Sequence, residues 1–131
     1  MSFSYKDDYI KYRIEKAYST LESAKLLAQN NFWNDSINRL YYSSFYAINA
    51  LLLKKNIDTK THKGLKSAFN QSLIKTGILK KEAGKTFNKL YEMRNKGDYN
   101  DLFDFNENNV VTLIIPVEEL INEVNDLLSE D

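Results

Sequence analysis

The chain has 131 residues, the size of one domain with its own hydrophobic core. Eighteen Lys and Arg residues balance eighteen Asp and Glu residues, which argues against RNA or DNA binding by the surface as a whole and leaves only a local basic patch for it. The chain has no Cys, which excludes disulfides, thiolate chemistry and cysteine-ligated zinc.

The first residues, MSFSYKDDYIKY, lack the apolar region of a signal peptide. No later stretch reaches the ~20 apolar residues that a membrane span needs. These features predict a soluble, cytoplasmic protein. With only four Gly and one Pro, little of the chain is expected to be loop.

A first helix is predicted from about Tyr5 to Ala28, because apolar residues recur there at helical spacing and charged residues lie between them. A polar connection follows, and Asn34 or Asp35 is expected to cap the next helix. The apolar positions of the first helix are Ile10, Ile14, Ala17, Leu21, Ala24 and Ala28.

The stretch from Asn34 to Lys55 is predicted to be the central helix of the fold. It is apolar on nearly all sides, which is typical of a helix inside a bundle or at a subunit interface. A narrow polar stripe of Arg39, Ser43 and Tyr46 runs along it. Because a buried charge without a partner costs about 3–5 kcal/mol, Arg39 must find acceptors.

A third helix is predicted to begin at a Thr59 or Thr61 cap and to end near Gly77. A fourth should cover about Lys80 to Tyr99. The residues expected to point inward from these two helices are Leu65, Phe69, Leu73, Ala83, Phe87, Leu90 and Tyr91.

The last segment has two readings. Val110 to Ile115 is a continuous β-branched run that suits a strand, whereas the apolar residues from Val117 to Leu128 have helical spacing. Because a single strand would have no partner, we expect a fifth helix, kinked or restarted at Pro116. The prediction is one all-α domain over residues 1–131, an antiparallel bundle of four to five helices.

Arg94 and Asp98 continue the inward-facing stripe of the fourth helix, so charges stand where the core should extend. One interpretation is an ordinary pair between Arg94 and Asp98 four residues apart. The other is a cationic group held in a cleft for a phosphate or other anion, beside Tyr99. Arg39 has the same two interpretations.

His62 is the only histidine, and no second metal ligand stands three or four residues away. A metal site is therefore not expected, and neither is a cofactor. His62 is either a cap or surface residue, or a catalytic group that reaches Arg94 from another helix or from a second subunit.

The chain resembles HEPN domain proteins in three stretches: Arg39-Leu40-Tyr41-Tyr42 with Phe45 and Ala47, Thr61-His62-Lys63-Gly64-Leu65 with Phe69, and Arg94 to Tyr99 (RNKGDY). The resemblance covers about Tyr5 to Asp101. It implies a small helical bundle, a homodimer, and often a minimal nucleotidyltransferase as a partner.

Many HEPN proteins are metal-independent ribonucleases, often toxins, and their motif is an Arg followed after four to six residues by a His. Arg94 matches this Arg, but Tyr99, Asn100 and Asp101 stand where the His would be. Cleavage through the 2′-hydroxyl needs a base that titrates near neutrality, and an unshifted Tyr has a pKa of ~10.

Three functions follow as alternatives. The first is a HEPN dimer without the usual nuclease motif that binds a nucleotide or RNA in a nucleotidyltransferase-linked toxin-antitoxin or defence system. The second is an endoribonuclease toxin with Arg94 and His62 as catalytic residues, and the third is a structural partner with internal ion pairs. The predicted nucleotide- or anion-binding residues are Arg39, Tyr42, Tyr46, Arg94, Asp98 and Tyr99.

Overall fold

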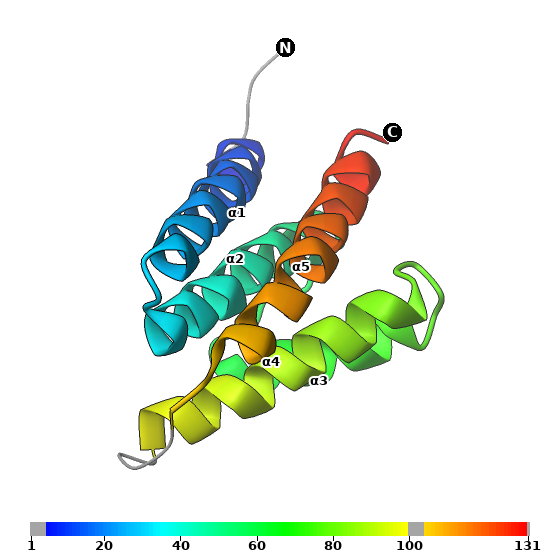
Figure 1. Ribbon diagram of the computed structural model, residues 1–131. Coiled ribbons are helices and arrows are strands. Elements are labelled where there is room, and N and C mark those ends of the chain that lie inside the picture. Colours follow the sequence, from blue (N-terminus) through cyan, green and yellow to red (C-terminus); the bar gives the residue numbers. More distant parts are fainter. Residues whose placement is uncertain (1–4, 100–103, 131) are drawn as a thin grey trace.

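The computed structural model describes residues 5–99 and 104–130, apart from the side chains of residues 98 and 99. In these ranges it is helical and contains no strand, which confirms the all-α bundle (Figure 1). The elements are α1 Tyr5–Gln29, α2 Trp33–Lys54, α3 His62–Ala68, the π-helix η1 Phe69–Ile74, α4 Lys81–Tyr99 and α5 Glu107–Leu128.

The helix α2 occupies the centre of the bundle. It packs against α1, α4, α5 and α3, and in Figure 1 the other helices lie around it. Its apolar side chains are therefore buried on several sides, and Tyr41, Leu51 and Leu52 have no exposed surface at all. Burying a side chain of this size contributes about 1.5–3 kcal/mol.

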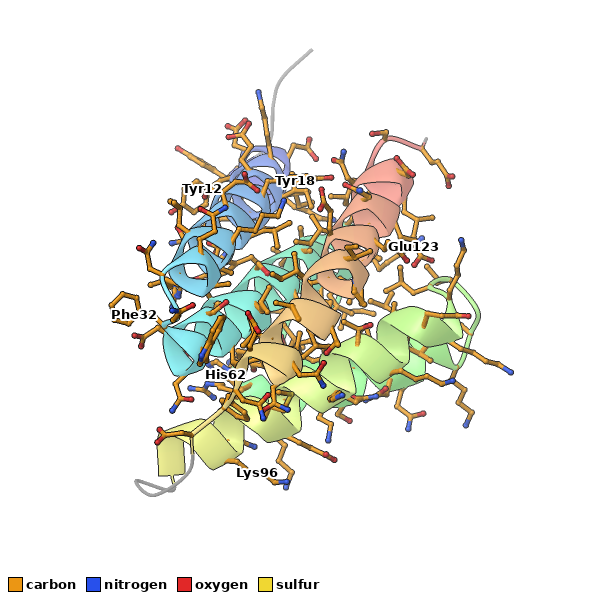
Figure 2. The ribbon with its side chains drawn as sticks, viewed as in Figure 1. Tyr12, Tyr18, Phe32, His62, Lys96 and Glu123 are labelled. Carbon is orange, nitrogen blue, oxygen red and sulfur yellow. The ribbon has the colours of Figure 1, made fainter. Side chains whose placement is uncertain are left out.

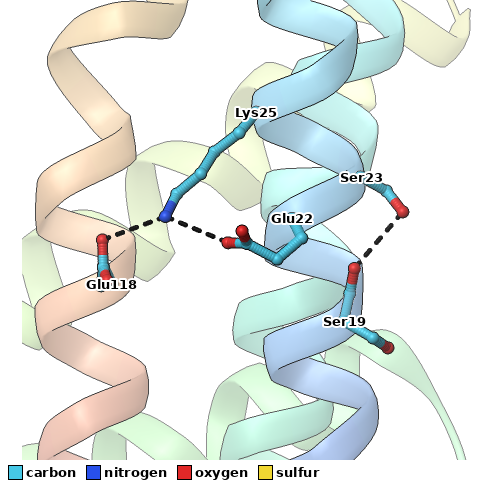
Figure 3. Close-up of polar contacts among 5 residues, drawn as sticks. All are labelled: Ser19, Glu22, Ser23, Lys25 and Glu118. Atoms are coloured by element: carbon cyan, nitrogen blue, oxygen red, sulfur yellow. Dashed lines mark hydrogen bonds and ion pairs between the residues drawn. The ribbon is translucent and has the colours of Figure 1, made fainter.

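Polar contacts join α1 to α5 at the rim of this core. The ammonium of Lys25 lies 3.1 Å from Glu22 on its own helix and 3.4 Å from Glu118 on α5 (Figure 3). The hydroxyl of Tyr18 donates to Asn122 on α5 at 2.7 Å. Because exposed ion pairs contribute little, the apolar contacts hold these helices together.

The third helical segment combines α3 and η1. The Thr61 hydroxyl accepts a hydrogen bond from the amide of Gly64 at 2.8 Å, so the cap predicted at Thr59 or Thr61 is at Thr61. In η1 the amide of Lys75 donates to the carbonyl of Asn70, five residues back. The segment ends before Gly77, whose φ of 80° lies in the left-handed region that Gly adopts readily.

The last helix resolves the ambiguity at Val110 to Ile115. These residues are helical, and one helix runs from Glu107 to Leu128 with Pro116 inside it, so the predicted fifth helix is confirmed and does not restart at Pro116. Asn106 and Asn109 cap its N-terminus reciprocally, each side chain accepting from the other's backbone amide.

The predicted cap of α2 is wrong, because this helix begins at Trp33 without a side-chain cap. Asn34 instead binds the chain before α5: its side chain accepts from the amide of Phe105 at 2.7 Å and donates to Asp104 at 3.3 Å. Among the helices in the described ranges, none is long and apolar enough to cross a membrane.

Candidate functional site

Arg94 lies against the two adjacent tyrosines of α2. Its guanidinium carbon is 5.1 Å from the centroid of the Tyr41 ring and 5.4 Å from that of Tyr42, and one of its Nη atoms donates to the Tyr42 hydroxyl at 3.2 Å. The side chain is half-buried. The ring faces stabilise the cation and leave it with little freedom to move.

Arg39 approaches the same tyrosine. Its guanidinium carbon lies 5.1 Å from the centroid of the Tyr42 ring, and two of its nitrogens donate to Asn38 at 2.9 and 3.3 Å. Two arginines that are 55 positions apart in the chain thus meet at one ring. Two positive charges that both contact one ring attract an anion there more strongly than either charge alone.

Arg94 also lines a cleft of about 280 Å³ between the start of α2 and the end of α4. Its other lining residues include Asn38, Gly97 and Phe105. Asp35 lines the cleft as well, so a carboxylate partly offsets the positive potential at this end.

His62 reaches the same pair of tyrosines from the start of α3. Its Nδ1 is 2.8 Å from the Tyr41 hydroxyl, and its ring centroid is 5.8 Å from those of Tyr41 and Tyr42 and 4.7 Å from that of Phe45. The His62 side chain is half-buried, whereas Lys96 of α4 is exposed and points away from the bundle (Figure 2). Arg94 and His62 thus both contact the same pair of tyrosines.

Burial lowers the pKa of His62 below its usual 6.5, and the positive charge of Arg94 lowers this pKa further. His62 is therefore neutral at pH 7. One ring nitrogen then carries a proton and the other has a free lone pair, which are the properties of a general acid and a general base.

The other predicted site residues have different positions. Tyr46 contacts the ring of Tyr42 at 5.9 Å between centroids, and it lies beside Arg13 and Lys16 of α1. The side chains of Asp98 and Tyr99 are outside the described residues, and so is the alternative in which Arg94 pairs with Asp98. Asn100 and Asp101 are outside them too.

Tyr41 is not among the predicted site residues. It is fully buried, yet it contacts both His62 and Arg94. Its spacing along α2 is that of a core position, so periodicity alone assigns it to packing. The signal that could have revealed its second role is its hydroxyl, because a buried Tyr needs a hydrogen-bond partner.

Comparison with known proteins gives one consistent family. The model of the HEPN domain matches residues 10–127. The chain belongs to the HEPN domain family. The site described above therefore lies in a HEPN domain, with its charged groups on α2, α3 and α4.

Curated relatives agree with this assignment. This HEPN chain is 38% identical to a "UPF0332 protein" of Thermotoga maritima over 95% of both chains. It is also 38% identical to "Putative toxin MJ0142" of Methanocaldococcus jannaschii, over 76% of this chain and 67% of that protein. A second protein of that organism, "Putative toxin MJ0605", is 36% identical over 66% of this chain and 64% of its own length.

The environment of His62 predicts its titration in this HEPN domain. Because the chain has one histidine, the imidazole C2 proton gives a single assignable NMR signal. We expect a pKa below 6.5 in the wild type and a higher pKa in Arg94→Ala, since that change removes a repelling charge and some burial. Arg39→Ala is the control and should move the pKa much less.

The same shift has a defined effect on stability. Since the folded protein holds the His62 proton more weakly than the unfolded chain, this group's stabilising contribution is present above pH ~6.5 and is lost as the pH falls through the folded pKa. A wild-type pKa at or above 6.5 would contradict the half-buried position of the imidazole near Arg94.

Proposed function

We propose that this HEPN protein is a toxin-class protein that binds single-stranded RNA, holding a phosphate at Arg94 and Arg39. The observation that carries the proposal is the convergence of both guanidinium groups on the Tyr42 ring, with Arg94 lining a cleft. Arginine fits phosphate oxygens with paired hydrogen bonds, and aromatic rings offer surfaces on which bases stack.

The chain's neutral overall charge agrees with a local site of this kind and not with a general nucleic-acid surface. In this proposal the protein lacks the usual Arg…His ribonuclease motif after Arg94. It works as a homodimer beside a minimal nucleotidyltransferase, within a toxin-antitoxin or defence system, as the family resemblance implies. The names of the two Methanocaldococcus jannaschii relatives support the toxin class.

A binding titration tests the proposal directly. We expect a fluorescent single-stranded RNA to bind the wild type, with affinity that falls between about 50 and 200 mM salt as counterions are released. Arg94→Ala should bind much more weakly and with a shallower salt dependence. A wild type that binds no RNA at the lower salt concentration would overturn the proposal.

The position of His62 favours a second candidate function, metal-independent cleavage of the bound RNA. In this step the 2′-hydroxyl loses its proton to His62 Nε2, the 2′-oxygen bonds to phosphorus, the bond from phosphorus to the 5′-oxygen breaks, and the departing 5′-oxygen takes a proton from water. The products are a 2′,3′-cyclic phosphate and a 5′-hydroxyl. For His62 to act as the base, its Nδ1–H must donate to the Tyr41 hydroxyl, because Nε2 then has the free lone pair. If the Tyr41 hydroxyl instead donates to Nδ1, the proton is on Nε2 and His62 acts as the acid.

Cleavage is expected to stop in His62→Gln, because a carboxamide cannot exchange a proton at neutral pH. The measurement is gel analysis of RNA incubated with each purified protein, with a 2′-deoxy substitution at the cleaved position as the substrate control. Wild-type protein that binds RNA and leaves it intact would refute this candidate and leave the binding proposal in place.

A further inference from the structure

A second cleft adjoins the arginine site on the side of α1. It has a volume of about 220 Å³ and lies between α1, the C-terminal half of α2 and the residues around the start of α3. Arg13, Phe45, Asn49 and His62 are among its lining residues. We refer to it as the Asn49 cleft.

Two polar atoms of this cleft are left unsatisfied. Within the described part of the chain, Asn49 Oδ1 and Arg13 Nε are buried and have no hydrogen-bond partner. One is an acceptor and the other is a donor. Since buried polar groups are nearly always paired in folded proteins, two such atoms in residues that line one cleft indicate a ligand with a complementary donor and acceptor.

Arg13 is held in a defined orientation. Its guanidinium carbon lies 4.8 Å from the centroid of the Tyr9 ring and 5.3 Å from that of Tyr46, and one of its Nη atoms donates to the Tyr9 hydroxyl. Lys16 lies 5.1 Å from the same Tyr46 ring. Stacking of this kind fixes the plane of the guanidinium before any ligand arrives.

The Asn49 cleft and the arginine site share side chains. The His62 ring lines the cleft and also contacts Tyr41 and Tyr42, which carry Arg94. Phe45, another lining residue, contacts the rings of His62 and Tyr42. One strand of nucleic acid can therefore occupy both places.

We propose that the Asn49 cleft binds a nucleobase of the same RNA strand whose phosphate is held at Arg94, an inference that rests on the proposed function. A nucleobase carries a donor and an acceptor side by side on its edge and has a flat face for stacking, which matches Asn49, Arg13 and the aromatic walls. The volume is below the ~300 Å³ at which sites for drug-sized ligands begin, so the cleft takes one base and not two.

The test uses calorimetry to compare the affinity for each nucleoside 5′-monophosphate with the affinity for the RNA trinucleotide built from that same nucleotide. We expect the wild type to bind at least one trinucleotide about tenfold more tightly than its monophosphate, as one additional base contact gives. Asn49→Leu should remove this gain and leave monophosphate binding unchanged. It should also raise the melting temperature, because it removes a buried acceptor without a partner.

Asn125→Leu is the matched control, since this residue is half-buried like Asn49 but lies on α5; it should keep the gain. If Asn49→Leu does not fold, Asn49→Ala replaces it. Two results would overturn the subsite alone. In the first, the Asn49 variant still binds the trinucleotide more tightly than the monophosphate. In the second, the wild type shows no such difference in affinity, while Arg94→Ala still abolishes monophosphate binding. Absence of any binding by the wild type overturns the subsite together with the proposed function.

Discussion

Replacing Tyr41 with alanine is expected to lower the free energy of unfolding by about 3–5 kcal/mol, the range for removing a large aromatic side chain from a core. Tyr41 has no exposed surface, and its ring contacts Phe45, Phe87 and Tyr91 at centroid distances of 5.6–6.2 Å. These neighbours belong to α2 and α4, so the cavity would open where the two helices meet.

Tyr41→Phe separates packing from hydrogen bonding at this position. It keeps the ring and removes the hydroxyl, so we expect a smaller loss of about 1–3 kcal/mol from leaving His62 Nδ1 without its partner. Urea denaturation followed by circular dichroism measures both variants. Tyr5→Ala is the control, because Tyr5 is 95% exposed and its replacement should change stability by less than about 0.5 kcal/mol.

A loss for Tyr41→Ala no larger than that of the Tyr5 control would show that Tyr41 is not packed as described. If Tyr41→Phe unfolds with unchanged free energy but shifts the His62 titration, the hydrogen bond exists in the wild type but does not contribute to its stability. The first outcome concerns the fold, and the second concerns the site.

Arg94→Ala is expected to weaken RNA binding by about 10- to 100-fold, which corresponds to the loss of a charge-assisted hydrogen bond of about 1.5–3 kcal/mol. The effect should be large because the cation is half-buried against Tyr41 and Tyr42, where water screens it less than at the surface. Fluorescence anisotropy with a labelled single-stranded RNA gives the affinity.

Two further variants make this prediction specific. Arg94→Lys keeps the charge but loses the planar group that stacks on the tyrosines and pairs with phosphate, so it should restore only part of the affinity. Lys96→Ala removes an exposed cation two residues along the same helix and should weaken binding only slightly (Figure 2). Equal losses in Arg94→Ala and Lys96→Ala would mean that the RNA follows general charge and not this site.

The helices could be predicted well because their signal is local. In α1 the spacing of Ile14, Ala17, Leu21 and Ala24 places them on one face, and all four are buried. The tertiary contact of Asn34 could not be predicted, because a short polar side chain suits a cap and a tertiary contact equally well. Its partner, the amide of Phe105, lies 71 positions away in the chain.

The amino-acid sequence by itself determined that this chain is a bundle of helices with a buried aromatic centre, because helical periodicity depends only on neighbouring residues. The sequence also singled out Arg94, because it is a charge within an apolar stripe, and His62, because it is the only histidine. Only the tertiary structure decided that both contact the Tyr41–Tyr42 pair, and that Arg13 and Asn49 line a second cleft beside it. The two hydrogen bonds, between His62 and Tyr41 and between Arg94 and Tyr42, join residues 21 and 52 positions apart, and packing between helices sets them.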